Sequence, residues 1–149
     1  MREILFRGKN IYNDWIYGYL CQHRGEPVMD NNGMVLEGSD YYIRDWAEKI
    51  DTGFYGCNYR VDPSTIGQYT GMNDKDGKEI FEGDIVKVTG LCPDRDENKR
   101  IWRKWRIGEV FYYHGSFYFG KWLLSQISEK LTEVIGNIHD NPELLEANT

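Results

Sequence analysis

One stretch of the chain, residues 67–88, has the residue types of a calcium loop. It reads GQYTGMNDKDGKEIFEGDIVKV, and such a loop needs oxygen ligands at positions 1, 3, 5 and 12 and a glycine at position 6. With Gly77 at position 6, Asp74 and Asp76 fall at ligand positions 3 and 5. Positions 1 and 12 then hold Met72 and a glycine, which offer no side-chain oxygen. The stretch therefore predicts a hairpin turn at Asp76-Gly77 and no metal site.

A second stretch, NKRIWRKWRI, has the composition of a site for single-stranded nucleic acid. Its cations can meet phosphates, and its flat rings can stack on bases. The alternative is an ordinary charged hairpin or a protein interface, because arginine stems cover exposed tryptophans on many strands and the acids of CPDRDEN just upstream can neutralise the patch. The candidate residues for binding a macromolecule are Lys99, Arg100, Trp102, Arg103, Lys104, Trp105 and Arg106.

The histidines and cysteines form no catalytic pattern. His23, His114 and His139 stand in no metal-ligand spacing, and none belongs to a motif with serine or cysteine. The three cysteines include no Cys-x-x-Cys pair, so neither a disulfide framework nor a zinc knuckle is indicated and a reducing cytoplasm fits best. We therefore predict a protein without catalytic residues, cofactor or metal.

A metal-dependent hydrolase or nuclease stays open as a third alternative. Catalytic residues can converge in three dimensions without forming a motif in the sequence. The carboxylates that such an enzyme would use here are Asp74, Asp76, Glu82 and Asp84.

Composition favours a β-rich domain. The 149 residues suit one domain, 1–149, within which 1–60 and 61–149 could form subdomains. Aromatic residues make up 15% of the chain, and they favour strands and interfaces. The net charge of −6 argues against a surface devoted wholly to phosphate. The first residues, MREILFRGKN, lack the apolar core of a signal peptide, and no 18-residue apolar run follows, so we expect no membrane association.

Turn residues divide the chain into short strands. An opening hairpin is predicted around KNIYND, a second around Asn32-Gly33, and a third around His114-Gly115. Between residues 44 and 60 the pattern favours one or two helical turns and then a glycine-rich loop. Residues 121–131 carry a helical apolar stripe, and Asn141 with Pro142 predicts the start of a last helix. We expect a mainly β fold of twisted antiparallel hairpins, forming a small barrel-like or sandwich domain with one or two short C-terminal helices.

Several of these segments together resemble the YopX-like family, whose members are small proteins encoded by bacteriophages and prophages. The resemblance is carried by VDPSTIGQYTGMNDKDGKEIFEGDIVKV, the opening MREILFRGKN, the GEVFY strand and the closing VIGNIHDNPELL. It implies a mostly β fold that is liable to oligomerise, and it supplies no catalytic residues. Residues 38–60 and the stretch LCPDRDENKRIWRKWR depart from the shared pattern.

The leading hypothesis for function is a non-enzymatic accessory protein of a phage or prophage, acting in the cytoplasm of the host bacterium. We expect a homo-oligomeric β domain that binds a phage or host macromolecule through aromatic surfaces, since aromatic side chains concentrate at the cores of interfaces. Nucleic-acid binding by residues 99–106 is the first alternative. The aromatic residues that we expect to matter most are Trp102, Trp105, Tyr112 and Tyr113.

Overall fold

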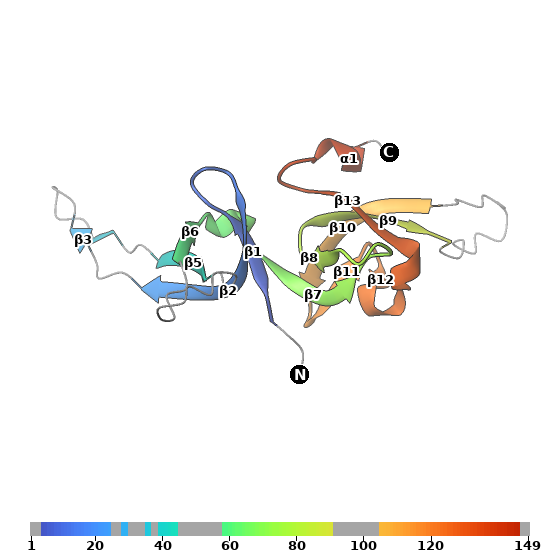
Figure 1. Ribbon diagram of the computed structural model, residues 1–149, viewed down its shortest axis with the longest axis horizontal. Helices are drawn as coiled ribbons and strands as arrows, with labels where there is room; N and C mark the ends of the chain where they lie inside the picture. The colour runs from blue at the N-terminus through green and yellow to red at the C-terminus, as the bar shows by residue number, and fades with distance from the viewer. Residues whose placement is uncertain are drawn as a thin grey trace, which may run out of the picture. The chain divides into compact units, whose positions relative to one another are not determined.

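The computed structural model describes residues 4–24, 28–29, 35–36, 39–44, 58–90 and 105–146 (Figure 1). The chain separates into two compact units, Met1–Gln68 and Tyr69–Thr149. The pairs between the described strands are all antiparallel, and α1 (Glu143–Glu146) is the one α-helix of the described residues. The predicted fold class, mainly β with antiparallel hairpins and a short C-terminal helix, is confirmed.

The first unit opens with the predicted hairpin of β1 (Phe6–Lys9) and β2 (Trp15–Arg24). Asn10 holds the turn between them, because its side-chain oxygen accepts hydrogen bonds from the backbone N–H groups of Tyr12 and Asp14 at 2.9 and 3.0 Å. Asn13 adopts a φ of 68°, a left-handed conformation that asparagine tolerates better than most residues. Local turn chemistry therefore determines this hairpin.

The far half of β2 pairs with β5 (Ser39–Arg44), and β5 in turn pairs with β6 (Asn58–Val61). Between β2 and β5 the chain forms a small antiparallel pair, β3 (Val28–Met29) with β4 (Val35–Leu36). This pair is the second predicted hairpin, although its Asn32-Gly33 turn lies outside the described residues.

The loop predicted up to residue 60 is wrong at its end, because residues 58–60 belong to strand β6. Tyr59 lies opposite Ile43 of β5, and Val61 at the end of the strand is 4% exposed. Pairing with β5 and burial of Val61 therefore override the glycine-rich local sequence. The helical turns are predicted over residues 44–50, of which Arg44 belongs to strand β5 and residues 45–50 lie outside the described residues.

Close packing in the first unit depends on two glycines. A Cβ on Gly8 would lie 3.0 Å from the Cβ of Val61, and a Cβ on Gly18 would overlap the carbonyl oxygen of Arg44. At the end of β6 the chain turns at the 3-10 helix η1 (Pro63–Thr65), as the proline predicts. It then enters β7 (Gly67–Asn73), whose first two residues pair with β1.

The second unit contains a five-stranded sheet with the order β12-β11-β10-β9-β13. The strands are β9 (Asp84–Thr89), β10 (Trp105–Tyr113), β11 (Ser116–Phe119), β12 (Trp122–Leu123) and β13 (Thr132–Asn137). The end of β7 pairs with β8 (Glu79–Phe81). One face of the sheet packs with β8 and the segment after β12 into a buried core formed by Ile80, Val86, Val88, Val110, Phe119, Leu124 and Ile127.

The predicted hairpin at His114-Gly115 is confirmed. Both residues have positive φ, 45° and 83°, as a type I′ turn requires. The turn sets the register of β10 against β11, with Tyr113 opposite Ser116 and Phe111 opposite Tyr118.

The α-helix predicted over residues 121–131 is wrong. After β12 the chain makes two separate 3-10 turns, η2 (Leu124–Gln126) and η3 (Glu129–Leu131). Leu124 and Ile127 are buried, but Leu131, the third residue of the supposed stripe, is 38% exposed. A 3-10 turn brings residues three apart onto one side, so a spacing of three imitates an α-helix in the sequence.

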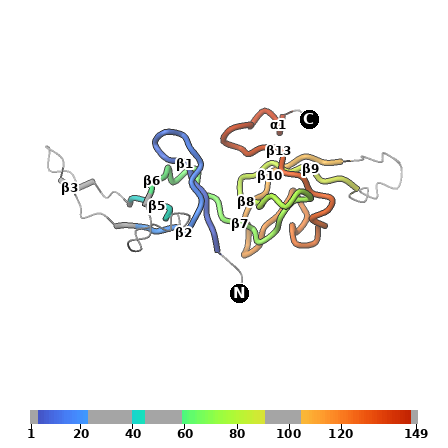
Figure 2. The backbone as a smooth tube through the Cα atoms, in the orientation of Figure 1, coloured from blue at the N-terminus to red at the C-terminus, as the bar shows by residue number. Residues whose placement is uncertain are grey.

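The last helix follows Asn141 and Pro142 as predicted, since α1 begins at the next residue. The chain after β13 folds back toward the strand (Figure 2), where a Cβ on Gly136 would lie 2.6 Å from the side-chain oxygen of Asn141 and 2.9 Å from Leu144. That oxygen accepts a hydrogen bond from the backbone N–H of Asn137 at 3.4 Å, so it fastens the helix to the end of β13.

Replacement of Gly18 by alanine tests how close the strands of the first unit lie. We expect Gly18→Ala to lower the free energy of unfolding by about 3 kcal/mol, because the new methyl group meets a backbone carbonyl that cannot move without breaking the β2–β5 pairing. Urea unfolding followed by circular dichroism measures the change. Gly77→Ala is the control, because its φ of 82° is also positive but no atom lies within 4 Å of the new Cβ, so only strain of about 1 kcal/mol is expected. Equal losses in the two variants would contradict the close approach.

Candidate functional site

The predicted turn at Asp76-Gly77 is present and is organised by Asp74. The backbone N–H of Gly77 donates to the carbonyl oxygen of Asp74 at 3.0 Å, and Gly77 has a φ of 82°. One carboxylate oxygen of Asp74 accepts the N–H groups of Asp76 and Lys78 at 2.9 and 3.0 Å. The other accepts the N–H of Val134 in β13 at 3.0 Å. Asp74 therefore joins its own turn to a strand sixty residues away.

The turn that Asp74 holds also covers the edge of β13 that does not face β9. The backbone N–H of Lys75 donates to the carbonyl oxygen of Thr132 at 2.9 Å, and the Lys75 ammonium lies 3.2 Å from Glu133. Just before the turn, the N–H of Asn73 donates to the carboxylate of Glu129 at 3.1 Å. Backbone groups at the edge of the sheet are thus hydrogen-bonded within the unit.

Hydrogen bonding also explains the ionisation of Asp74. Burial alone would raise the pKa of its carboxyl group, since the residue is only 6% exposed. The three backbone N–H groups and the charge of Lys78 outweigh burial and hold the pKa of Asp74 below its ordinary value. The carboxylate stays charged and serves the fold.

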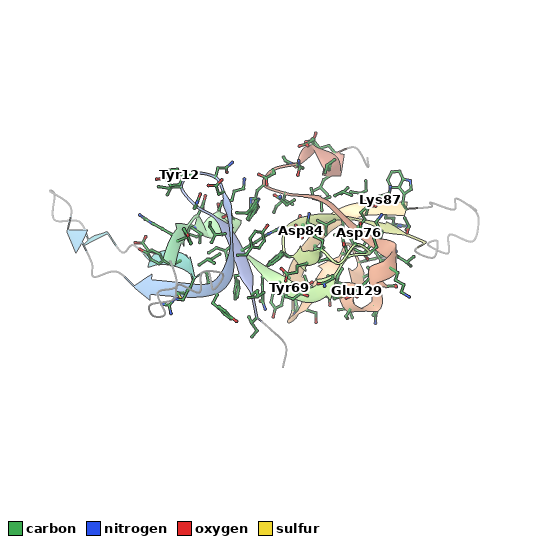
Figure 3. All side chains as sticks on the ribbon, viewed as in Figure 1. Tyr12, Tyr69, Asp76, Asp84, Lys87 and Glu129 are labelled. Atoms are coloured by element: carbon green, nitrogen blue, oxygen red, sulfur yellow. The ribbon has the colours of Figure 1, made fainter. Side chains whose placement is uncertain are left out.

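Two other carboxylates of the metal alternative, Asp76 and Asp84 (labelled in Figure 3), have different surroundings. Asp84 is 1% exposed, and its carboxylate accepts the backbone N–H of Phe81 at 2.8 Å. The Asp76 side chain is 72% exposed and lies 3.9 Å from the ammonium of Lys75. Within the described parts of the chain, no group of three or more histidines, cysteines or acids is arranged to hold a metal ion.

The basic and aromatic candidates are only partly described. Lys99, Arg100, Trp102, Arg103 and Lys104 lie outside the described residues. Trp105 and Arg106 begin β10 and point to opposite faces of it, as successive strand residues do.

The two described candidates have separate surroundings. The Trp105 ring is 44% exposed, and the ammonium of Lys87 lies 5.5 Å from its centre. The guanidinium of Arg106 lies 4.8 Å from the ring of Trp122, which also has the ammonium of Lys121 at 5.3 Å. The structure therefore does not bring Trp105 and Arg106 to one surface.

The end of the β10–β11 hairpin carries rings on both faces. On one face Tyr112 contacts Phe117 with ring centres 5.2 Å apart. On the other face Phe111 stacks on Tyr118 at 5.9 Å, and Tyr113 meets Tyr118 edge to face at 6.3 Å. Tyr112 and Tyr113 are 51% and 58% exposed. These five residues are called the aromatic hairpin below.

Sequence reasoning found Tyr112 and Tyr113 but missed the other three residues of the aromatic hairpin. The signal was present in VFYY and SFYF on the two sides of His114-Gly115. A two-residue type I′ turn sets Phe111 opposite Tyr118 and Tyr112 opposite Phe117, so the partners could have been read from the turn.

Glu109 precedes Phe111 by two residues and therefore lies on the same face of β10. The side chain is half-buried. Burial, and then the negative charge of Glu82, raise the pKa of Glu109 above its ordinary value. The aromatic face thus has a partly desolvated carboxyl group at one end.

His114 and His139 take part in turns of the second unit. His114 is exposed in the type I′ turn, as predicted. The backbone N–H of His139 donates to the side chain of Asn137 at 3.0 Å, within the chain reversal before α1.

Removal of the Asp74 carboxylate tests its role in the fold. We expect Asp74→Ala to lower the free energy of unfolding by about 3 kcal/mol, because three partly buried backbone N–H groups lose a charged acceptor. Asp76→Ala is the matched control, and its exposed side chain predicts a change within about 0.5 kcal/mol. Chemical denaturation measures both.

The same measurement across pH gives a second check. Since the folded-state pKa of Asp74 is below the ordinary value of 3.8, its contribution is complete above that pH and is lost as the pH falls through the folded-state value. The stability difference between wild type and Asp74→Ala should therefore shrink in acid. A difference that stays constant down to the acid transition would argue against a charged carboxylate as the acceptor.

None of the described helices is long and apolar enough to cross a membrane.

A solved structure shares this fold. The chain is similar to the crystal structure of protein EF1440 from Enterococcus faecalis, with 23% sequence identity, a TM-score of 0.50, and coverage of 97% of this chain and 99% of that chain. No curated protein matches the sequence.

A family match covers nearly the whole chain and agrees with the resemblance seen in its turn and strand motifs. The model of the YopX protein family matches residues 6–146. The chain belongs to the YopX protein family.

Proposed function

We propose that this protein is a non-enzymatic, oligomeric β domain of a phage or prophage, and that it binds a phage or host macromolecule through the aromatic hairpin. The observation that carries the proposal is the exposure of Tyr112 and Tyr113 beside three further rings at the end of one hairpin. Tyrosine is enriched at the energetic centres of interfaces because it buries a large area with few rotatable bonds.

Other residues already determine the hairpin, so its formation does not depend on these rings. The His114-Gly115 turn sets the hairpin register, and the buried residues Val110 and Phe119 anchor the hairpin in the core. About half of each of the two tyrosines stays exposed to water. A partner could bury this surface, since each aromatic side chain can bury roughly 150–250 Å². Binding of a second surface supplies that burial.

The proposal places the protein in the cytoplasm of a bacterial host. Its three cysteines include no Cys-x-x-Cys pair, and Cys21 is a free thiol in the structure. Partners in that compartment are a second copy of the chain, a host protein or another phage protein.

Loss of the two exposed rings tests the proposal. We expect the double variant Tyr112→Ser and Tyr113→Ser to shift wild-type oligomers toward monomer and to lose the partners captured from infected cells, while its thermal midpoint stays close to that of wild type. Sedimentation velocity and quantitative pull-down measure the two effects. Tyr12→Ser is the matched control, because Tyr12 is 78% exposed in the other unit. A wild type that is monomeric at every concentration and captures nothing that the double variant loses would refute the proposal.

Nucleic-acid binding by residues 99–106 is the second candidate. The favouring observation is the half-exposed Trp105 ring with the Lys87 ammonium 5.5 Å away, since a ring and a cation on one face can serve a base and its phosphate. The opposed direction of Arg106 and the net charge of −6 make it the weaker candidate.

A salt titration tests this candidate. Fluorescence anisotropy with a labelled thymidine oligonucleotide should give binding at low salt that weakens as salt rises. A plot of the logarithm of the binding constant against the logarithm of the salt concentration gives a slope. Neutralising Arg103, Lys104 and Arg106 together should flatten this slope by roughly 0.7 for each phosphate that no longer meets a cation. Lys130→Gln, which removes an exposed cation elsewhere in the unit, should leave the slope unchanged. No binding at low salt would eliminate the candidate.

A further inference from the structure

The three tryptophan rings that the structure describes each have a cation of the same chain nearby. The guanidinium of Arg7 lies 4.6 Å from the ring centre of Trp15, and Lys9 lies 5.3 Å from it. Trp105 has Lys87, and Trp122 has Arg106 and Lys121. Each of these rings therefore has its attractive cation–π contact within the fold.

The face of the aromatic hairpin that carries Phe111, Tyr113 and Tyr118 differs. Among the described residues these three rings contact one another and His114, and none has a cation over it. Leu123 of β12 lies opposite Tyr118 and extends the same face with an apolar side chain. The face is a short row of rings and one leucine across three strands.

A half-buried carboxylate borders this face. Glu109 lies two residues from Phe111 on the same side of β10, and its side chain has no ion pair or hydrogen bond to the described residues. The nearby charge of Glu82 adds to the negative potential. Side chains two apart along a strand lie roughly 7 Å from each other, so one long side chain can contact both the carboxylate and the ring.

We propose that this face binds an arginine side chain of a partner protein, with its guanidinium paired to the Glu109 carboxylate and stacked on the Phe111 and Tyr118 rings. The inference rests on the proposed function and names the chemistry of its partner. Arginine fits better than lysine, because its planar group can stack on a ring while its N–H groups meet a carboxylate side-on. Glu109 and the nearby Glu82 repel a phosphate placed at Phe111 and Tyr118, whereas Lys87 beside Trp105 lies farther along the same face of the sheet.

Ionisation of Glu109 gives the interaction a pH dependence. Burial and then the charge of Glu82 raise the pKa of Glu109. Other charged residues on the elements beside it are Lys87 of β9 and Glu143 and Glu146 of α1, which packs against β10. An arriving guanidinium favours the charged form and offsets both effects. Binding should therefore weaken as the pH falls through the raised pKa, at a higher pH than an ordinary glutamate would require.

A defined probe tests the proposal with the full-length protein. The probe is an acetylated hexapeptide of alternating arginine and leucine, and its comparison peptide has citrulline, a neutral analogue of the same shape, in place of each arginine. Titration followed by NMR shifts and by calorimetry should show the arginine peptide binding about tenfold more tightly. Shifts should concentrate on Phe111, Tyr118 and Leu123.

Variants separate the local contact from general attraction to an acidic protein. Glu109→Gln should remove most of the preference for arginine over citrulline, whereas Glu79→Gln, which neutralises an exposed carboxylate on β8, should leave it unchanged. Equal affinity for the two peptides, or equal effects of the two glutamine variants, would overturn the proposal.

A third variant distinguishes this inference from the proposed function. If Tyr113→Ser weakens both peptides while Glu109→Gln changes neither, the aromatic hairpin binds partners but arginine recognition is refuted. If wild type binds neither peptide at low salt, the inference is likewise refuted, and the oligomer and pull-down measurements alone then decide the proposed function.

Discussion

The second unit depends on a single carboxylate. Asp74 accepts hydrogen bonds from two N–H groups of its own turn and from Val134 in β13, so one side chain both shapes a loop and attaches it to the edge of the sheet. A neutral side chain could not match this, because charged acceptors form the stronger hydrogen bonds and a buried N–H without a partner is costly. The acidic stretch that suggests calcium chemistry is thus engaged in holding the β7–β8 hairpin.

The aromatic residues divide into those that stabilise the fold and those whose rings are exposed. Phe119 is buried in the core and fills the space left by Gly108, where a Cβ would lie 2.9 Å from the ring. The described tryptophans, Trp15, Trp105 and Trp122, each have a cation of the chain near the ring. The rings of the aromatic hairpin are not buried in this core, and no described cation lies over them. The His114-Gly115 turn and the core residues Val110 and Phe119 already determine the hairpin without them. The proposed recognition of a partner would therefore cost the fold little at this position.

Most turns and strands could be predicted from the sequence, and the two corrections have physical causes. The sequence of residues 58–60 favours a loop, yet β5 offers an unpaired edge and the strand forms there. The spacing of Leu124 and Ile127 fits an α-helix as well as a 3-10 turn, and in the structure the backbone at Ile127 is extended and ends the turn. Within the candidate site, the sequence was enough to identify the exposed Tyr112 and Tyr113. Their ring partners could be identified only from the register of β10 against β11.

The sequence by itself determined the reversals of the chain. Asn10, Asp76-Gly77 and His114-Gly115 each supply a side-chain acceptor or a positive φ, and these preferences act within a few residues. Only the tertiary structure decided that Asp74 would meet Val134, that Trp105 and Arg106 would point apart, and that Glu109 would border a row of rings. Such contacts join residues on different strands, and they exist only after pairing and packing have set which faces meet.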